Sequence, residues 1–139
     1  MKTKEYRIKD ICEIKSGKRI PLGLNFVLER TNHPYIRARD IKNGNINTQD
    51  LIYLDDFTYN KIKKYIIQEN DIAITIVGAS VGDIGYANKE VDGWNLTENA
   101  VRLTNFNNAD SKFVYYLLIQ KQYNELMQTI AGGAAQPKL

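Results

Sequence analysis

The sequence predicts an α+β fold, a single domain with a mixed, strongly twisted β-sheet core and a C-terminal helical hairpin. Two observations carry this prediction. The run from Asp71 to Gly85 alternates like a buried strand, passes a turn rich in small residues and resumes as a second strand. Between Asp110 and Ile130 the period changes, because apolar residues recur there at helical spacing. Strands first and helices last are typical of the α+β class.

The N-terminal third contains two apolar patterns separated by a loop. Isoleucines spaced three apart in residues 6–14 predict a short strand that leads into one helical turn. Glycine and proline in residues 16–23 mark an ordered loop. Residues from Pro34 to Ile41 alternate cleanly, which predicts one strand with Arg37 and Arg39 on the same face.

The middle of the chain is divided by turn signals. Asn43-Gly44 predicts a turn followed by a short strand, and an edge strand is expected over residues 51–54. Two acids directly before residues 57–65 suit the N-terminal end of a short helix. A strand pair, or one strand after a turn at Asp92-Gly93, is expected over residues 94–103.

Size and composition fit one globular domain covering residues 1–139. Hydrophobic residues make up 43% of the chain and charged residues 25%, both ordinary values for such a domain. No apolar run approaches the roughly 20 residues that cross a bilayer, and no signal peptide is evident. A single cysteine, Cys12, cannot form an internal disulfide. These features suggest a soluble, cytoplasmic protein.

Positive charge is concentrated at the N-terminal end. Residues 1–43 hold eleven Lys or Arg against five acids, whereas residues 44–139 hold eight against eleven. The first third therefore has a balance of +6 within a chain of net charge +3. Such asymmetry suggests a surface that faces a polyanion, the alternative being a solubilising face without a partner.

Motifs for catalysis are poorly supported, so we expect no catalytic residues and no metal. The glycines of residues 78–85 lie between strands and lack the spacing of a phosphate-binding loop. His33 and Cys12 are the only histidine and the only cysteine, too few for a typical metal site. Glu13-Ile14-Lys15 matches the acid-x-lysine fragment of metal-dependent nucleases, but such a site needs a further acid from a neighbouring strand.

Side chains suited to DNA binding are more numerous. Arginine forks bridge phosphate oxygens or the edge of guanine, and amides and hydroxyls contact base edges or phosphates. We expect Arg37 and Arg39 to face a duplex while Lys18 and Arg19 clamp its backbone. The full set of candidate DNA contacts is Lys15, Lys18, Arg19, Arg37, Arg39, Ser80, Asn88, Asn95 and Gln136.

Five segments in a fixed order, spread over nearly the whole chain, carry a family resemblance. They are Ile8-Lys9-Asp10-Ile11 leading to Ser16-Gly17-Lys18, Pro34 to Ile41, Asn70 to Gly82, Asn95 to Ala100, and Phe113 to Leu118 with Gly132 to Pro137. In this order they resemble the target recognition domain of type I restriction-modification specificity subunits.

The resemblance implies a non-catalytic subunit that recognises one half of a bipartite DNA target. It would dock on the methyltransferase (modification) subunit and direct adenine methylation, or cleavage through the restriction subunit. S-adenosylmethionine would be bound by that partner, and no cofactor is expected here, since the chain lacks an Asn/Asp-Pro-Pro-Tyr/Phe signature.

A full specificity subunit resembles two such domains separated by long helices, and this chain reaches the point where the first spacer would begin. We therefore expect a single recognition domain, either a fragment or a half-size protein, and the sequence leaves open whether two copies pair as a homodimer to mimic the missing half. Two other functions stay open. One is a protein-interaction module that docks through residues 110–130 without binding DNA, and the other is a small nuclease using Glu13 and Lys15.

Overall fold

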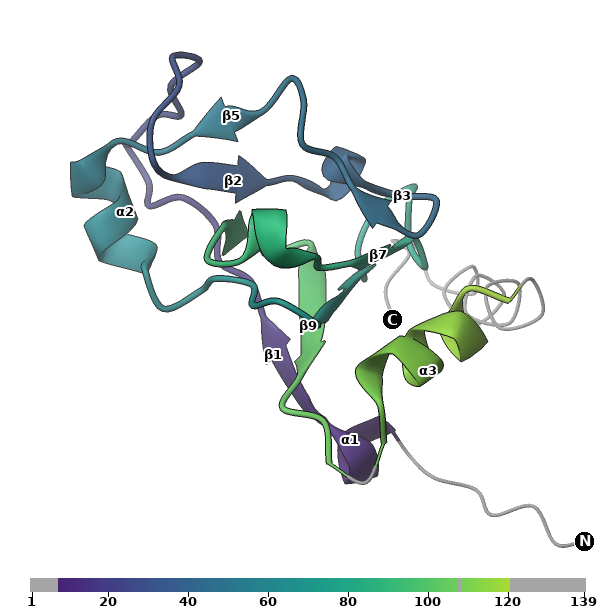
Figure 1. Ribbon diagram of the computed structural model, residues 1–139. Helices are drawn as coiled ribbons and strands as arrows, with labels where there is room; N and C mark the ends of the chain where they lie inside the picture. The colour runs from purple at the N-terminus through teal and green to yellow at the C-terminus, as the bar shows by residue number, and fades with distance from the viewer. Residues whose placement is uncertain (1–7, 108, 121–139) are drawn as a thin grey trace, which may run out of the picture.

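Three small β-sheets form the centre of the domain (Figure 1). The computed structural model describes residues 8–107 and 109–120. The largest sheet is antiparallel, in the order β1 (Glu13–Ser16), β9 (Ala100–Thr104), β6 (Ile72–Thr75), β7 (Ile84–Tyr86). The second is mixed, with β2 (Pro34–Ile36) antiparallel to β5 (Ile52–Tyr53) and parallel to β8 (Asn95–Leu96). The third is a hairpin of β3 (Ile41–Lys42) and β4 (Asn45–Ile46).

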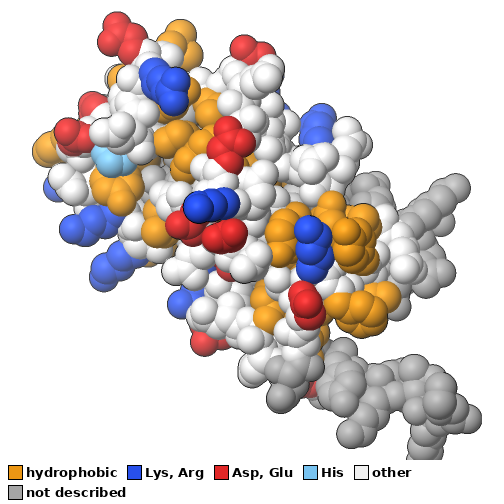
Figure 2. Space-filling model, viewed as in Figure 1, with side chains coloured by type: hydrophobic (Ala, Val, Ile, Leu, Met, Phe, Trp, Pro, Cys, Tyr) orange, Lys and Arg blue, Asp and Glu red, His pale blue; other side chains and the backbone are white. Residues whose placement is uncertain are grey.

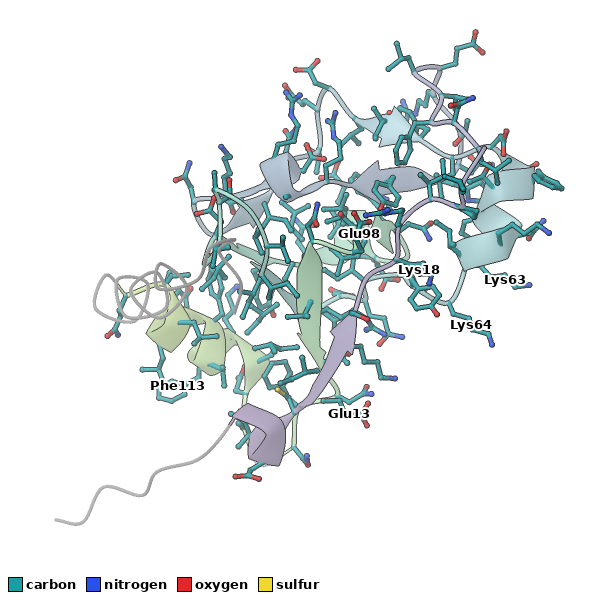
Figure 3. The ribbon with its side chains drawn as sticks, turned by 180° about the vertical axis from the view of Figure 1, so that it is seen from behind. Glu13, Lys18, Lys63, Lys64, Glu98 and Phe113 are labelled. Atoms are coloured by element: carbon teal, nitrogen blue, oxygen red, sulfur yellow. The ribbon has the colours of Figure 1, made fainter. Side chains whose placement is uncertain are left out.

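Three α-helices and two 3-10 helices complete the described part of the chain. They are α1 (Ile8–Ile11), α2 (Asp56–Ile62), α3 (Ser111–Leu118), η1 (Ala38–Asp40) and η2 (Lys89–Val91). In both ribbon views α2 and α3 lie on opposite sides of the molecule (Figures 1 and 3). The mixed sheet and the α3 helix confirm the predicted α+β class. The second helix of the expected hairpin and Gln136 lie outside the described residues.

Strand β6 is the centre of the largest sheet because it pairs on both sides and is buried along its whole length. Its side chains alternate between two cores, as the two-residue period of a strand requires. Ile72 and Ile74 pack in a cluster with Val114 of α3, whereas Ala73 belongs to a second cluster with Ile36. The predicted strand pair over residues 71–85, covered on both faces, is confirmed.

Several local predictions are also confirmed. Asn43 and Gly44 adopt φ angles of 54° and 82° in the β3–β4 turn, the left-handed conformation that such hairpins need. Asp55 caps α2, since its side chain accepts a hydrogen bond of 2.8 Å from the backbone N–H of Thr58. Strand β5 is an edge strand as expected.

Three predictions need correction. At the N-terminal end the helix precedes the strand, because residues Glu13–Ser16 extend to pair with β9. Strand β2 ends at Ile36, and Arg37 begins η1, so no strand presents Arg37 and Arg39 on one face. Strands β8 and β9 belong to different sheets, so the expected strand pair over residues 94–103 is wrong, whereas β8 does follow a turn at Asp92-Gly93 as the alternative predicted. In the part of the chain that is described, no helix is long and apolar enough to cross a membrane.

Candidate nucleic-acid interface

Lysines from two distant segments lie together on one side of the domain (Figure 3). A groove of about 350 Å³ separates β1 from the turn after α2. Its lining residues are Ile14, Lys15, Ser16, Lys64, Tyr65 and Arg102. Lys18 lies beside it, with its Nζ 5.8 Å from the centre of the Tyr65 ring. We call the exposed cations Lys15, Lys18, Lys63 and Lys64 the basic rim.

Strand β8 brings the two segments together although it is only two residues long. The N–H of Lys18 donates to the carbonyl of Leu96 at 2.9 Å, and the N–H of Leu96 donates to the carbonyl of Tyr65 at 3.0 Å. The Tyr35 hydroxyl, from the neighbouring strand, donates to the carbonyl of Lys18 at 2.8 Å. The N-terminal loop and the turn after α2 are therefore held to the same short strand.

Gly17 makes the close approach of the N-terminal loop to β8 possible. A Cβ atom at this position would lie 2.0 Å from the carbonyl oxygen of Thr97 and 2.4 Å from that of Leu96. Both neighbours are backbone atoms, so no side-chain movement would relieve the overlap. A glycine between Ser16 and Lys18 is thus a packing requirement of this loop.

The floor of the groove is a buried ion pair. The Nη1 of Arg102 lies 2.7 Å from Oδ2 of Asp71, and the two side chains are 8% and 4% exposed. Arg102 also donates to the Thr104 hydroxyl at 3.1 Å, and Asp71 accepts the N–H of Gln68 at 2.8 Å. The carboxylate of Asp71 neutralises the guanidinium, so Arg102 stabilises the floor of the groove. The positive charge that a ligand can reach is that of the basic rim.

Two exposed ion pairs lie beside the rim. Lys15 lies 3.5 Å from Glu13, whose pKa is lowered by a hydrogen bond from Asn105 and by the charge of Lys15. Arg19 lies 3.8 Å from Glu98 with its side chain 75% exposed. Ion pairs this open to solvent are weak, so either cation can exchange its carboxylate for a phosphate.

Lys63 and Lys64 were missed by the sequence prediction. Among the described residues, no acid lies within ion-pair distance of either lysine, and both are exposed. The available signal was the cluster of lysines at residues 61–64, at the end of a predicted helix. Lysines there also suit the helix dipole, so their proximity to Lys18 was needed to indicate a binding surface.

The other candidate contacts are dispersed, and three have structural partners. Arg37 forms a two-pronged bond with the buried Asp40, at 3.0 and 3.2 Å. Asn88 caps η2 by accepting the N–H of Glu90 at 3.0 Å. Asn95 has no exposed surface. Arg37 and Asn95 are thus part of the packing of the domain, whereas Asn88 is exposed and its Oδ1 is engaged in the cap.

Arg39 and Ser80 lie apart from these structural contacts. Arg39 is exposed on η1. Ser80 is partly buried in the turn between β6 and β7, where its carbonyl accepts the N–H of Asp83 at 3.0 Å. Gly78 and Gly82 give that turn its shape, with φ angles of 99° and 94°. Of the nine candidates, Lys15 and Lys18 contribute to the basic rim and Arg19 lies next to Lys18 in the same loop.

The nuclease alternative gains no support from the geometry. Glu13 and Lys15 lie on the same side of β1, 3.5 Å apart. Within residues 8–107 and 109–120, however, no three His, Cys, Asp or Glu side chains are grouped so that they could hold a metal ion. Cys12 is buried, and burial raises the pKa of its thiol, which disfavours a nucleophilic role.

Comparisons with known proteins agree on one family. A family model described as the type I restriction modification DNA specificity domain matches residues 1–139, and a comparison with curated proteins finds no match. The fold is similar to that of the S subunit of a type I restriction-modification system from M. genitalium, with a TM-score of 0.59 and 22% identity over 92% of this chain. It is also similar, with a TM-score of 0.65 and 17% identity over 89% of this chain, to a chain solved in work on complex assembly and conformational transition of the type I R-M system.

The two solved chains establish likeness of fold, and this chain spans 28% of the length of each. The family match covers the whole sequence. It agrees with the order of segments on which the resemblance was based and with the α+β architecture. The chain belongs to the family of type I restriction modification DNA specificity domains.

Proposed function

We propose that this chain recognises one half of a bipartite duplex DNA target within a type I restriction-modification complex. One observation carries the proposal beyond the family match, namely the lysines on one side of the domain: Lys15 and Lys64 line one groove, Lys18 lies beside it, and Lys63 lies next to Lys64 (Figure 3). Lysines in high-dielectric surroundings act as point charges toward phosphates. They neutralise the DNA backbone and fix the register of the domain on the duplex.

Sequence would be recognised by side chains other than the basic rim, since phosphate contacts carry no sequence information. Arg19, Arg39, Ser80 and Asn88 are the candidates on the described surface, and Gln136 stays a prediction. Each would act through hydrogen bonds to base edges in a groove of the duplex. We expect no catalysis and no bound cofactor in this chain.

The proposed partner is the methyltransferase subunit, which would bind S-adenosylmethionine and carry out the methyl transfer in the cytoplasm. The restriction subunit would join through that complex. Work on one similar solved chain concerns complex assembly of the type I R-M system, which supports such an arrangement. Because the chain spans 28% of each solved relative, a second domain or a second copy would recognise the other half-site.

The test is a salt series of duplex DNA binding, with and without the cognate methyltransferase subunit. Lys18→Ala/Arg19→Ala and Lys63→Ala/Lys64→Ala should each lower affinity and reduce the slope of log K against log salt by about 1 to 2. Lys112→Ala, on α3 at the other side of the domain, is the control for removal of a positive charge outside the basic rim. Unchanged slopes in both double variants would place the DNA elsewhere, and no binding even with the partner would reject the function.

A protein-interaction module is the second candidate, because α3 exposes an apolar stripe. Phe113, Tyr116 and Ile119 are 62%, 53% and 39% exposed, and Figure 2 shows hydrophobic side chains gathered over α3. This reading predicts that the chain with its methyltransferase subunit does not bind DNA at physiological salt. The same salt series therefore separates the two functions.

A further inference from the structure

We infer that Asn95 is a positioning residue for DNA binding, acting on Lys63 and Lys64 from inside the domain. The inference rests on the proposed function and adds a residue that would contact no DNA. Asn95 lies on β8 with no exposed surface. Its Nδ2 donates to the carbonyl of Ile62 at 2.9 Å.

The bonded carbonyl belongs to the last residue of α2. Carbonyls at the end of a helix lack partners within the helix and need others. The carbonyl of Ile62 accepts two bonds, one from the N–H of Tyr65 at 3.0 Å and one from Asn95. Lys63 and Lys64 are the two residues enclosed by the Ile62–Tyr65 bond. The amide of Asn95 therefore fixes the start of the turn that contains both lysines, while the backbone bond from Leu96 fixes its end at Tyr65.

The same strand holds the other half of the basic rim. Leu96, the neighbour of Asn95, accepts the N–H of Lys18. A movement of the turn relative to β8 would therefore change the spacing between Lys18 and the two lysines after α2. Phosphates are regularly spaced along the DNA backbone, so a set of cations contacts them together only when the cations have a matching spacing. The buried bond of Asn95 would therefore affect DNA binding at the surface.

The environment of Asn95 indicates that the functional group at this position is the Nδ2–H donor and not the Oδ1 acceptor. In the described structure, its Oδ1 is buried and has no hydrogen-bond partner. An unpaired buried acceptor costs free energy, and an apolar side chain of similar size would avoid that cost. A leucine would fill the space but donate no bond to Ile62, so the donor distinguishes asparagine from its apolar replacement.

The test compares duplex DNA binding of the chain, together with its methyltransferase subunit, for the wild type and for Asn95→Leu. We expect about a 5- to 10-fold loss of affinity and a smaller salt slope, with the circular dichroism spectrum unchanged. Thr75→Val is the matched control. Thr75 is equally buried, and its hydroxyl likewise has no partner in the described structure, but it lies on β6, which pairs with β7 and β9 and not with β8 or the turn after α2. This control should bind DNA as the wild type does.

A double-mutant cycle with Lys63→Ala/Lys64→Ala decides between positioning and a general loss of stability. If Asn95 acts through the lysines, Asn95→Leu should add no further loss once they are removed. Additive losses, or wild-type affinity in Asn95→Leu, would overturn the inference. If Asn95→Leu does not fold, Asn95→Ala gives the same cycle. If Lys63→Ala/Lys64→Ala binds DNA as the wild type does, the proposed contact between the basic rim and DNA is wrong, whatever Asn95→Leu does.

Discussion

The floor and the rim of the groove both carry positive charge, but the two regions use it differently. Arg102 in the floor is buried and bonded to Asp71, whereas the lysines of the basic rim are exposed. A buried charge is costly unless it is paired, so its partner becomes part of the folded structure. An exposed charge contributes little to folding and stays available to a ligand. Changes in the floor should therefore alter stability, and changes in the rim should alter binding.

The largest expected effect is the removal of the acid in the floor. Asp71→Ala leaves Arg102 buried without its carboxylate and removes the acceptor for the N–H of Gln68. The free energy of unfolding should fall by about 3 to 5 kcal/mol, measured by urea denaturation. Asp71→Leu/Arg102→Met, which removes both charges, should recover much of that loss. A loss below about 1 kcal/mol in Asp71→Ala would show that the floor is not the rigid base described here.

High pH should destabilise the fold at the hydrogen bond that the Tyr35 hydroxyl donates to the carbonyl of Lys18. Burial raises the pKa of Tyr35 from 10.0 to about 12. Below pH 10 the hydroxyl is protonated in both the folded and the unfolded chain, so it adds no pH dependence. Between pH 10 and 12 the unfolded chain loses this proton first, and the free energy of unfolding should fall by about 2 to 3 kcal/mol.

Urea denaturation at pH 9 and pH 12 measures this loss. Tyr35→Phe is the control, because it lacks the titrating hydroxyl while it keeps the ring. The rest of the chain is identical in the two proteins, so the difference between the two pH dependences belongs to Tyr35. Equal pH dependence in the wild type and in Tyr35→Phe would contradict the prediction.

Thr75→Val should have a smaller effect of the opposite sign. Within the described residues the Thr75 hydroxyl is buried and unpaired, and valine has nearly the same shape without the polar atom. The free energy of unfolding should rise by about 1 kcal/mol. Thermal denaturation with wild-type and Thr75→Val proteins side by side gives the sign, and a clear loss of stability would mean that the hydroxyl has a partner.

The smallest expected effect lies in the rim. Lys63→Gln/Lys64→Gln should change the free energy of unfolding by no more than about 0.5 kcal/mol, since both side chains are exposed and have no acid within ion-pair distance in the described structure. Urea denaturation measures it. A fall in the free energy of unfolding as large as that of Asp71→Ala would show that the rim contributes to folding as much as the floor does.

Local features of the fold were predictable from the sequence. The turn at Asn43-Gly44 and the cap at Asp55 depend on backbone angles and on hydrogen bonds between residues no more than three apart. The pairing of β6 with β7 could be predicted because one turn joins the two strands. These features need no knowledge of the rest of the chain.

Features that join distant residues were not predictable in the same way. Strand β1 pairs with β9 in the register Glu13↔Thr104, and this pairing reversed the expected order of helix and strand. Lys64 reaches the groove of Lys15 only because both segments bind β8. Such contacts depend on the burial of the whole core, which the pattern of one sequence does not reveal.

The glycine at position 17 has a practical consequence for anyone who wishes to alter the proposed affinity of the basic rim for DNA. The cations on either side of it are exposed and can be varied, but any side chain at position 17 would collide with the backbone of Thr97 and Leu96. A library that randomises residues 15–19 should therefore keep Gly17 constant. Without that restriction, most of its members would be lost through misfolding before their affinities for DNA could be compared.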